Sequence, residues 1–189
     1  MAPRRHPHTM TKASYTRIAI TGTPGTGKTS ICKLAESTVS VSDLAAEIGA
    51  LGEVDPIDGA APIDIEKLRG FLAEEWAQPP DQMLLVDGHL SHLLPVDAVV
   101  IIRCDPRILA ERNAARDWAG SKVEENSEWE LLGGAWSEQE EWAKLPVLEL
   151  ESTENSPEVL FAEISDWMGV AFKPDSPEHP IDWVERIHG

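Results

Sequence analysis

The stretch that decides the fold is GTPGTGKTS, residues 22–30, which directly follows the apolar run RIAIT. It fits the pattern G-x-x-x-x-G-K-[ST], with Gly22, Gly27, Lys28 and Thr29 at the fixed positions. Glycines let the chain turn with positive φ and expose successive backbone N–H groups, which suit phosphate oxygens. The stretch therefore predicts a phosphate-binding loop between a strand and a helix.

The loop also predicts how phosphate and metal are held. A helix that opens at about Lys28 adds roughly half a positive charge near the phosphates. The Lys28 ammonium is expected to reach the β and γ oxygens of a nucleotide. The Thr29 hydroxyl is the expected ligand for Mg²⁺, which needs few protein oxygens. Mg²⁺ bound together with ATP is thus the predicted cofactor.

Length and composition indicate one soluble domain. The chain has 189 residues, of which 42% are apolar, enough for a sizeable core. It contains no apolar run of the roughly 18 residues that a membrane span needs, and its N-terminus lacks the apolar segment of a secretory signal. Cys32 and Cys104 have no metal spacing and are expected to be buried free thiols. We expect a cytoplasmic protein without a membrane partner.

Charge is distributed unevenly. Residues 1–17 hold four basic residues and no acid, and the rest of the chain holds 12 basic against 33 acidic residues, a net charge of −21. This acidic body excludes nonspecific nucleic-acid binding. The acid excess fits either a surface suited to high salt or simply a soluble acidic protein. Residues 1–16 are predicted to be a basic disordered tail.

Short β-like runs alternate with longer helical ones. The predicted strands are residues 17–20, 38–41, 82–86, 98–102 and 147–150. Three of them are apolar throughout, as in a parallel sheet covered on both faces. A helix is predicted over 64–76 with Asp64 as its cap, and another begins at Asp105-Pro106. The pattern favours a three-layer α/β P-loop NTPase fold with about five parallel strands.

Two further groups bear on the chemistry. The run MLLVDGH ends an apolar strand in Asp87, the layout of a second Mg²⁺-site carboxylate. His89 follows two residues later and either orders a water or acceptor or is a structural histidine. Arg103, Arg107, Arg112 and Arg116 are four of the nine arginines of the chain, packed into 14 residues. Guanidinium groups suit phosphate oxygens, although surface arginines also pair with acids such as Glu111.

Together these residues resemble the adenylate kinase isoenzyme 6 family, short-lid nucleotide kinases that are also linked to small-ribosomal-subunit assembly. The resemblance runs from Arg17 to Trp167. It covers ITGTPGTGKTS, VSDLA at 41–45, VDGH, and ERNAARDWAGSKVEENSEWE, which is similar to the family's lid and following helix. It implies a kinase domain over 17–169, a monophosphate-binding segment over 40–63 and a lid over 115–125.

The resemblance also implies site residues. Gly25, Gly27, Lys28, Thr29 and Ser30 match the ATP-phosphate positions, Arg116 the lid arginine, Asp87 and His89 the Asp-x-His pair, and Ser42, Asp43 and Leu44 the monophosphate-binding segment. Two departures stand out. The usual Gly-Tyr after the lid arginine is Asp117-Trp118, which places an acid beside Arg116. A C-terminal extension over 170–189 has no recognised counterpart from Phe172 onward.

The function implied is adenylate kinase activity, ATP + AMP giving two ADP, with Arg116 and Arg112 neutralising the transferred phosphoryl group. A second interpretation is an ATPase switch in small-subunit assembly, with a ribosomal protein as partner and Asp87 and His89 assisting water. A kinase for another small metabolite is a third. A GTPase is excluded, because the chain lacks Asn-Lys-x-Asp, and its DWAG follows a helix where a strand is required.

Overall fold

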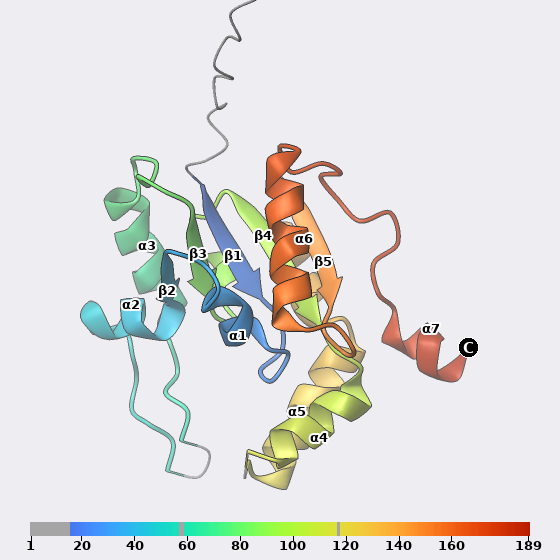
Figure 1. The fold of residues 1–189 in the computed structure, drawn as a ribbon. Coiled ribbons are helices and arrows are strands. Elements are labelled where there is room, and N and C mark those ends of the chain that lie inside the picture. Colours follow the sequence, from blue (N-terminus) through green and yellow to red (C-terminus); the bar gives the residue numbers. More distant parts are fainter. Residues whose placement is uncertain (1–15, 57–58, 117) are drawn as a thin grey trace, which may run out of the picture.

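The computed structural model describes residues 16–56, 59–116 and 118–189. At its centre lies a sheet of parallel strands in the spatial order β2-β3-β1-β4-β5 (Figure 1). The strands are β1 (Arg17–Thr21), β2 (Thr38–Ser40), β3 (Leu84–Asp87), β4 (Ala98–Arg103) and β5 (Val147–Glu151). The predicted parallel sheet of about five strands is confirmed.

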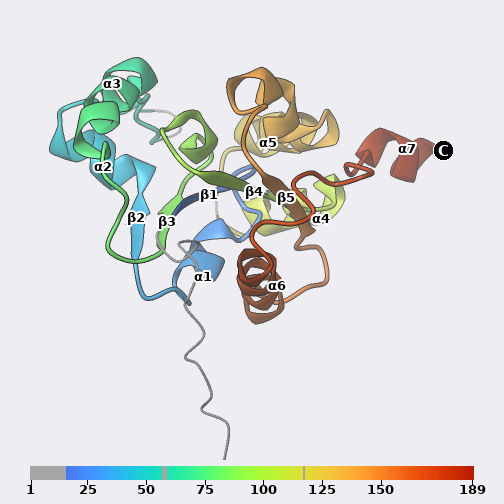
Figure 2. The ribbon, with the colours of Figure 1, turned by 90° about the horizontal axis from the view of Figure 1, so that it is seen from above.

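Helices cover both faces of the sheet. They are α1 (Lys28–Cys32), α2 (Val41–Glu47), α3 (Ile65–Glu75), α4 (Pro106–Ala114), α5 (Gly120–Leu131), α6 (Pro157–Gly169) and α7 (Trp183–His188), with 3₁₀ turns η2 (Ser91–Leu93) and η3 (Gly134–Glu141). Figure 2 shows α1 and α6 on one face, and α2, α3 and η3 on the other. No helix in the described part of the chain is long and apolar enough to cross a membrane.

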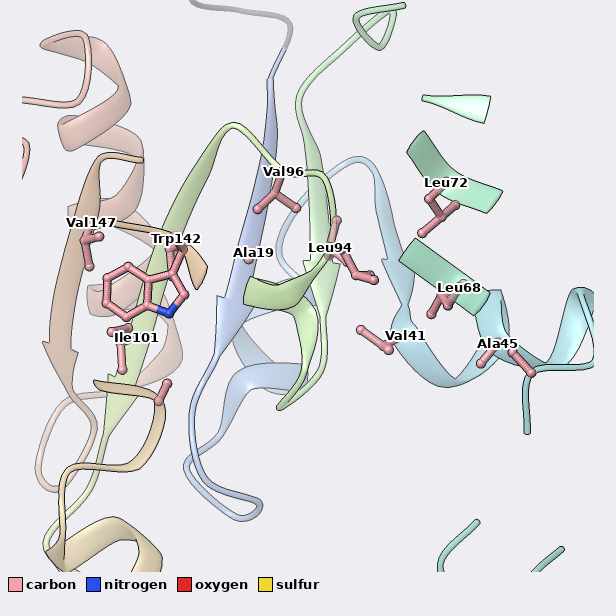
Figure 3. Close-up of a cluster of buried hydrophobic side chains, with 14 residues drawn as sticks. Ala19, Val41, Ala45, Leu68, Leu72, Leu94, Val96, Ile101, Trp142 and Val147 are labelled. Atoms are coloured by element: carbon pink, nitrogen blue, oxygen red, sulfur yellow. The ribbon is translucent and has the colours of Figure 1, made fainter. Parts of the chain in front are cut away.

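Alternation along the strands divides the core in two. In β1, Ala19 packs toward α2 and α3, whereas Ile18 and Ile20 pack toward α1 and α6. Figure 3 shows the first cluster, in which Trp142 lies over the sheet beside Ile101. Because side chains of a strand point alternately to the two faces, a strand buried on both faces must be apolar throughout. This explains the uninterrupted apolar runs of β1 and β4.

The predicted helix starts are confirmed, and some boundaries move. The Asp64 carboxylate caps α3 by accepting a hydrogen bond from Lys67 N at 3.0 Å, and Asp105 caps α4 in the same way. The third strand begins two residues later than predicted and includes Asp87. Val41, predicted to end a strand, instead begins α2, because the Ser40 side chain caps this helix through Asp43 N.

The topology brings the sequence motifs to one edge of the sheet. Parallel strands end at the same edge, and the loop over 22–27 leaves that edge after β1. Ile20 pairs with Asp87 in the ladder between β1 and β3, so the Asp87 carboxylate stands directly beside the start of the loop. The predicted tail 1–16 lies outside the described residues, except for Thr16.

Candidate active site

The loop after β1 has the backbone that its glycines predict. Gly22 has a φ of 138° and Gly25 a φ of 103°, both in the region that favours glycine. A Cβ on Gly22 would lie 2.2 Å from the carbonyl oxygen of Ile102, and one on Gly25 would lie 2.1 Å from Oδ1 of Asn113. Glycine is therefore required at both positions by conformation and by space.

Lys28 lies folded back on this loop. Its Nζ donates hydrogen bonds to the carbonyl oxygens of Gly22 at 2.8 Å and Thr23 at 3.0 Å, and the side chain is buried. Burial lowers the pKa of Lys28 to about 8, while the nearby carboxylates of Asp87 and Glu130 act in the opposite direction. The ammonium is thus poorly solvated, and its present partners are neutral carbonyl oxygens. The charged oxygens of a phosphate would be stronger acceptors for it.

Oxygen ligands suitable for Mg²⁺ come from the first turn of α1 and from the end of β3. Thr29, the predicted Mg²⁺ ligand, is exposed in the first turn of α1, as is the next residue, Ser30. Asp87 is half-buried at the end of β3, and its charge acts on Lys28. A hydroxyl and a carboxylate are hard donors that fit Mg²⁺, which keeps several waters and takes the remaining ligands from phosphate.

His89 is held at the edge of the site through its backbone. Its carbonyl oxygen accepts a hydrogen bond from Thr21 Oγ1 at 2.9 Å, and the same hydroxyl lies 2.8 Å from Nδ1 of buried His92. Nε2 of His92 lies 2.9 Å from Glu138. The His89 side chain is exposed, and its pKa is lowered by partial desolvation and by Lys28, so the imidazole is neutral at pH 7.

The four arginines of the predicted cluster have separate surroundings. Arg103 is fully buried against Glu130 and Glu149, and exposed Arg107 pairs with Asp105. Arg112 donates to the carbonyl oxygens of Ser152 and Thr153 at 2.9 and 3.1 Å, so its guanidinium is engaged in holding the turn after β5. Arg116 is exposed to solvent. Of the four arginines, it is therefore the one whose guanidinium is accessible to a bound phosphate.

Arg116 and the loop border one small cavity. This cavity has a volume of about 210 Å³. It is lined by Gly25, Gly27, Ser30, Arg112, Arg116, Ser152, Asn155 and Pro157, among others. Ser152 and Asn155 belong to the turn between β5 and α6, and Pro157 begins α6; the sequence patterns did not indicate this turn. The cavity continues from the phosphate loop, as a site for the nucleoside part of a nucleotide would.

Two buried side chains from the stretch that resembles the lid and its following helix hold the loop from α4 and α5. Asn113 Nδ2 donates to the carbonyl oxygen of Pro24 at 3.0 Å. The Thr23 hydroxyl donates to Oε2 of Glu130. Both Asn113 and Glu130 are 0% exposed. Within that stretch no local pattern distinguishes Glu130 from the neighbouring acids, and Asn113 is recognisable only as lying one turn before Arg116.

The predicted lid lies at the junction of α4 and α5. Arg116 lies over the ring of Trp118, with Cζ 5.8 Å from the ring centroid, and Lys122 lies over the same ring at 5.0 Å. Asp117, the departure from the family pattern, lies outside the described residues. A larger, mostly apolar groove of about 540 Å³ separates α4 from α5 on a side that the loop does not line.

The predicted monophosphate-binding segment is acidic. Ser42 and Asp43 are exposed on α2, whereas Leu44 packs against the core. Further along, Leu51 and Ile63 form an antiparallel bridge at the base of a protruding loop, whose residues 57 and 58 are not described. From Leu34 to Glu66 the sequence holds no Lys, Arg or His. The segment itself thus supplies no cationic side chain for a phosphate.

Known proteins resemble the chain in sequence. The family described as AAA domain matches residues 18–133. A protein named putative adenylate kinase from Pyrococcus abyssi is 42% identical over 156 residues, covering 78% of this chain and 81% of that protein. One of the same name from Archaeoglobus fulgidus is 39% identical over 180 residues, covering 90% of this chain and 93% of that protein.

Solved structures resemble the chain in fold. A shikimate kinase from Bacteroides thetaiotaomicron matches with a TM-score of 0.52 at 14% identity, covering 82% of this chain and 99% of that one. A gluconokinase from Sinorhizobium meliloti matches with a TM-score of 0.51 at 13% identity, covering 83% and 93%. The predicted α/β P-loop NTPase fold is confirmed.

Proposed function

We propose, from the premise that the chain belongs to the family of these putative adenylate kinases, that it transfers the γ-phosphoryl group of ATP to AMP. The observation that carries the proposal is the poorly solvated Lys28 ammonium within a glycine-shaped loop, flanked by Asp87 and by Arg116. Each of the three matches a position of a phosphoryl-transfer site, where positioning and charge provide most of the catalysis.

In this proposal ATP binds with its phosphates on residues 22–30 and its nucleoside in the 210 Å³ cavity. Phosphate oxygens replace the loop carbonyls as partners of the Lys28 ammonium. Thr29 and Asp87 would hold Mg²⁺, which supplies charge neutralisation at the β and γ oxygens when bound. Ser30 lies in the first turn of α1, where its hydroxyl can donate to a phosphate.

AMP is placed under residues 40–63, with Ser42, Asp43 and Leu44 as candidate contacts. The lid over 115–125 closes on the two nucleotides. Arg116 then meets the negative charge of the transferred group, and closure excludes water that would otherwise be phosphorylated. Arg112 acts at this point by holding the turn that borders the cavity.

A second candidate is ATP hydrolysis, as an ATPase switch in small-ribosomal-subunit assembly. It is favoured by the lack of any cationic side chain from Leu34 to Glu66, because an AMP phosphate in that segment would have to rely on Arg116 and on backbone N–H groups. Neutral His89, two residues after Asp87, offers a ring nitrogen that can accept a hydrogen bond from an attacking water and so orient it. A ribosomal protein as partner is implied by the family resemblance alone.

One assay separates the two candidates. ATP consumption is measured with Mg²⁺, alone and with each nucleoside monophosphate in turn, and Lys28→Ala protein serves as the inactive control. Strong stimulation by AMP, with ADP as the product, supports the kinase. Turnover that is unchanged by any monophosphate contradicts it and supports the ATPase.

A further inference from the structure

The carboxylate of Glu130 lies between the phosphate loop and the C-terminal segment. Its Oε1 accepts hydrogen bonds from Arg103 Nε at 2.7 Å, Trp183 Nε1 at 3.0 Å and the backbone N–H of Cys104 at 3.1 Å. Its Oε2 accepts a hydrogen bond from the Thr23 hydroxyl. One carboxylate, fully shielded from solvent, therefore joins β4, α7 and the second residue of the loop.

The C-terminal segment closes this network from outside. The backbone N–H of Ile181 donates to Glu149 Oε2 at 2.7 Å, and its carbonyl oxygen accepts from Arg103 Nη1 at 3.2 Å. Glu149 also accepts from Arg103 Nη1 at 2.9 Å. Trp183, the first residue of α7, is 3% exposed. The extension without a recognised counterpart thus supplies direct partners to a buried charge cluster.

We propose that Glu130 is a positioning residue for the phosphate loop, and that Trp183 of the C-terminal segment is required to hold Glu130 in place. The inference rests on the proposed nucleotide site, since its effect is on ATP binding. Neither residue borders the loop cavity, and Glu130 acts on ATP through Thr23.

The path from Trp183 to the nucleotide has three steps. Trp183, Arg103 and Cys104 N fix Oε1 of Glu130, which directs Oε2 toward Thr23. The Thr23 hydroxyl fixes the residue whose carbonyl oxygen accepts from Lys28 Nζ at 3.0 Å. A loop held in the geometry that binds phosphate loses less entropy on binding than a loop that must be ordered. Loss of one donor to Glu130 should therefore reach the loop.

Of the two carboxylates in the buried network, Glu130 is the one that bonds the loop. Glu130 and Glu149 both pair with the single guanidinium of Arg103. The remaining oxygen of Glu130 accepts from Thr23. A positioning role for Glu130 therefore predicts a change in the affinity for ATP when one of its donors is removed, whereas a purely structural role would change thermal stability alone.

The first test compares two tryptophans. Trp183→Phe removes the N–H that donates to Glu130, and Trp136→Phe is the matched control, because Trp136 Nε1 donates to Glu149 at 2.7 Å in the same network. The dissociation constant for ATP is measured for both full-length variants, together with the unfolding temperature. We expect a rise of about fivefold for Trp183→Phe and no change for Trp136→Phe, with similar losses of thermal stability.

The second test approaches the path from the loop. Thr23→Val removes the hydroxyl while keeping the branched shape, and should raise the dissociation constant for ATP by about fivefold. In the double variant with Trp183→Phe the constant should stay close to that of Thr23→Val alone, because both changes break one path.

Three outcomes overturn the proposal. The first is a dissociation constant for ATP that Thr23→Val leaves unchanged. The second is an equal change in this constant for Trp183→Phe and Trp136→Phe. The third is a double variant, Thr23→Val with Trp183→Phe, whose increase in the constant equals the product of the two single increases. A wild-type protein that does not bind ATP would contradict this inference and the proposed function together. A wild-type protein that binds ATP but does not phosphorylate AMP would contradict the proposed reaction alone.

Discussion

Asn113 Nδ2 donates a hydrogen bond to the carbonyl oxygen of Pro24 at 3.0 Å, so helix α4 holds the phosphate loop directly. Arg116, the predicted lid arginine, follows Asn113 by three residues, and its backbone N–H donates to the Asn113 carbonyl oxygen at 3.1 Å. The same turn of helix therefore fixes the loop and presents the guanidinium. We therefore expect that a movement of the proposed lid would reach the loop through this turn.

We predict that Asn113→Asp weakens ATP binding by about tenfold or more. The change removes the donor to Pro24 and places a carboxylate beside Gly25, where the incoming phosphates are expected. Asn126→Asp is the matched control, because Asn126 Nδ2 also donates to a backbone carbonyl, that of Lys122 at 2.8 Å, on α5. Titration with ATP measures both. Equal affinities for the two variants would argue against contact between α4 and the loop in solution.

The lowered pKa of Lys28 predicts that the protein takes up protons when ATP binds. This pKa is lowered to about 8 in the free protein, and nucleotide phosphates favour the ammonium form, so binding must raise this pKa. Near pH 8 and slightly above it, the protein should take up protons when ATP binds, and affinity should fall as the pH rises further. The phosphates of ATP are already ionised there and release few protons.

Calorimetry of ATP binding in two buffers of different ionisation enthalpy measures this uptake. Lys28→Met should abolish this uptake and weaken ATP binding, whereas Lys67→Met should do neither, because exposed Lys67 bonds the Gly49 carbonyl away from the loop.

The lowered pKa of Lys28 also makes the stability of the fold depend on pH. Burying the ammonium costs free energy, and this cost is relieved as the pH rises from about 8 toward the ordinary value of 10.5.

We expect Asp87→Asn to weaken ATP binding more with Mg²⁺ than without it. The amide keeps the shape of the side chain but lacks the negative charge that a divalent cation requires. Asp97→Asn is the control, because Asp97 lies before β4 at the opposite edge of the sheet, where it accepts from Arg17 N at 2.8 Å. Binding titrations with and without Mg²⁺ give the comparison. An equal loss in both would identify Asp87 as a structural residue.

The sequence predicts those parts of the site that depend on local pattern. The loop, the strand that ends in Asp87 and the Asp64 cap are each determined by residues a few positions apart, and the structure confirms their placement. Glu130 is different, because its partner Thr23 lies 107 residues away, and the resemblance of the stretch that ends at Glu130 does not reveal this contact. The surroundings of the arginine cluster could not be predicted for the same reason, since the partners of Arg103 and Arg112 come from distant segments.

The last prediction separates the two candidate functions through Arg116 and His89. Arg116 is placed to meet charge on the transferred group, and that charge develops whether AMP or water is the acceptor. Arg116→Ala should therefore reduce AMP phosphorylation and ATP hydrolysis alike, by about 100-fold or more if the guanidinium acts as arginines do in related transfers. Rates that are both unchanged would mean that the lid assignment over 115–125 is wrong.

His89 should instead change the ratio of the two rates. As a neutral imidazole two residues after Asp87, it either orders the attacking water or helps to seat AMP. In the first case His89→Ala lowers hydrolysis and spares AMP phosphorylation, and in the second case the order is reversed. Both rates are measured in one preparation, so a loss of folded protein cancels in the ratio. A ratio equal to that of the wild type would remove His89 from both mechanisms and leave its carbonyl, held by Thr21, as its structural role.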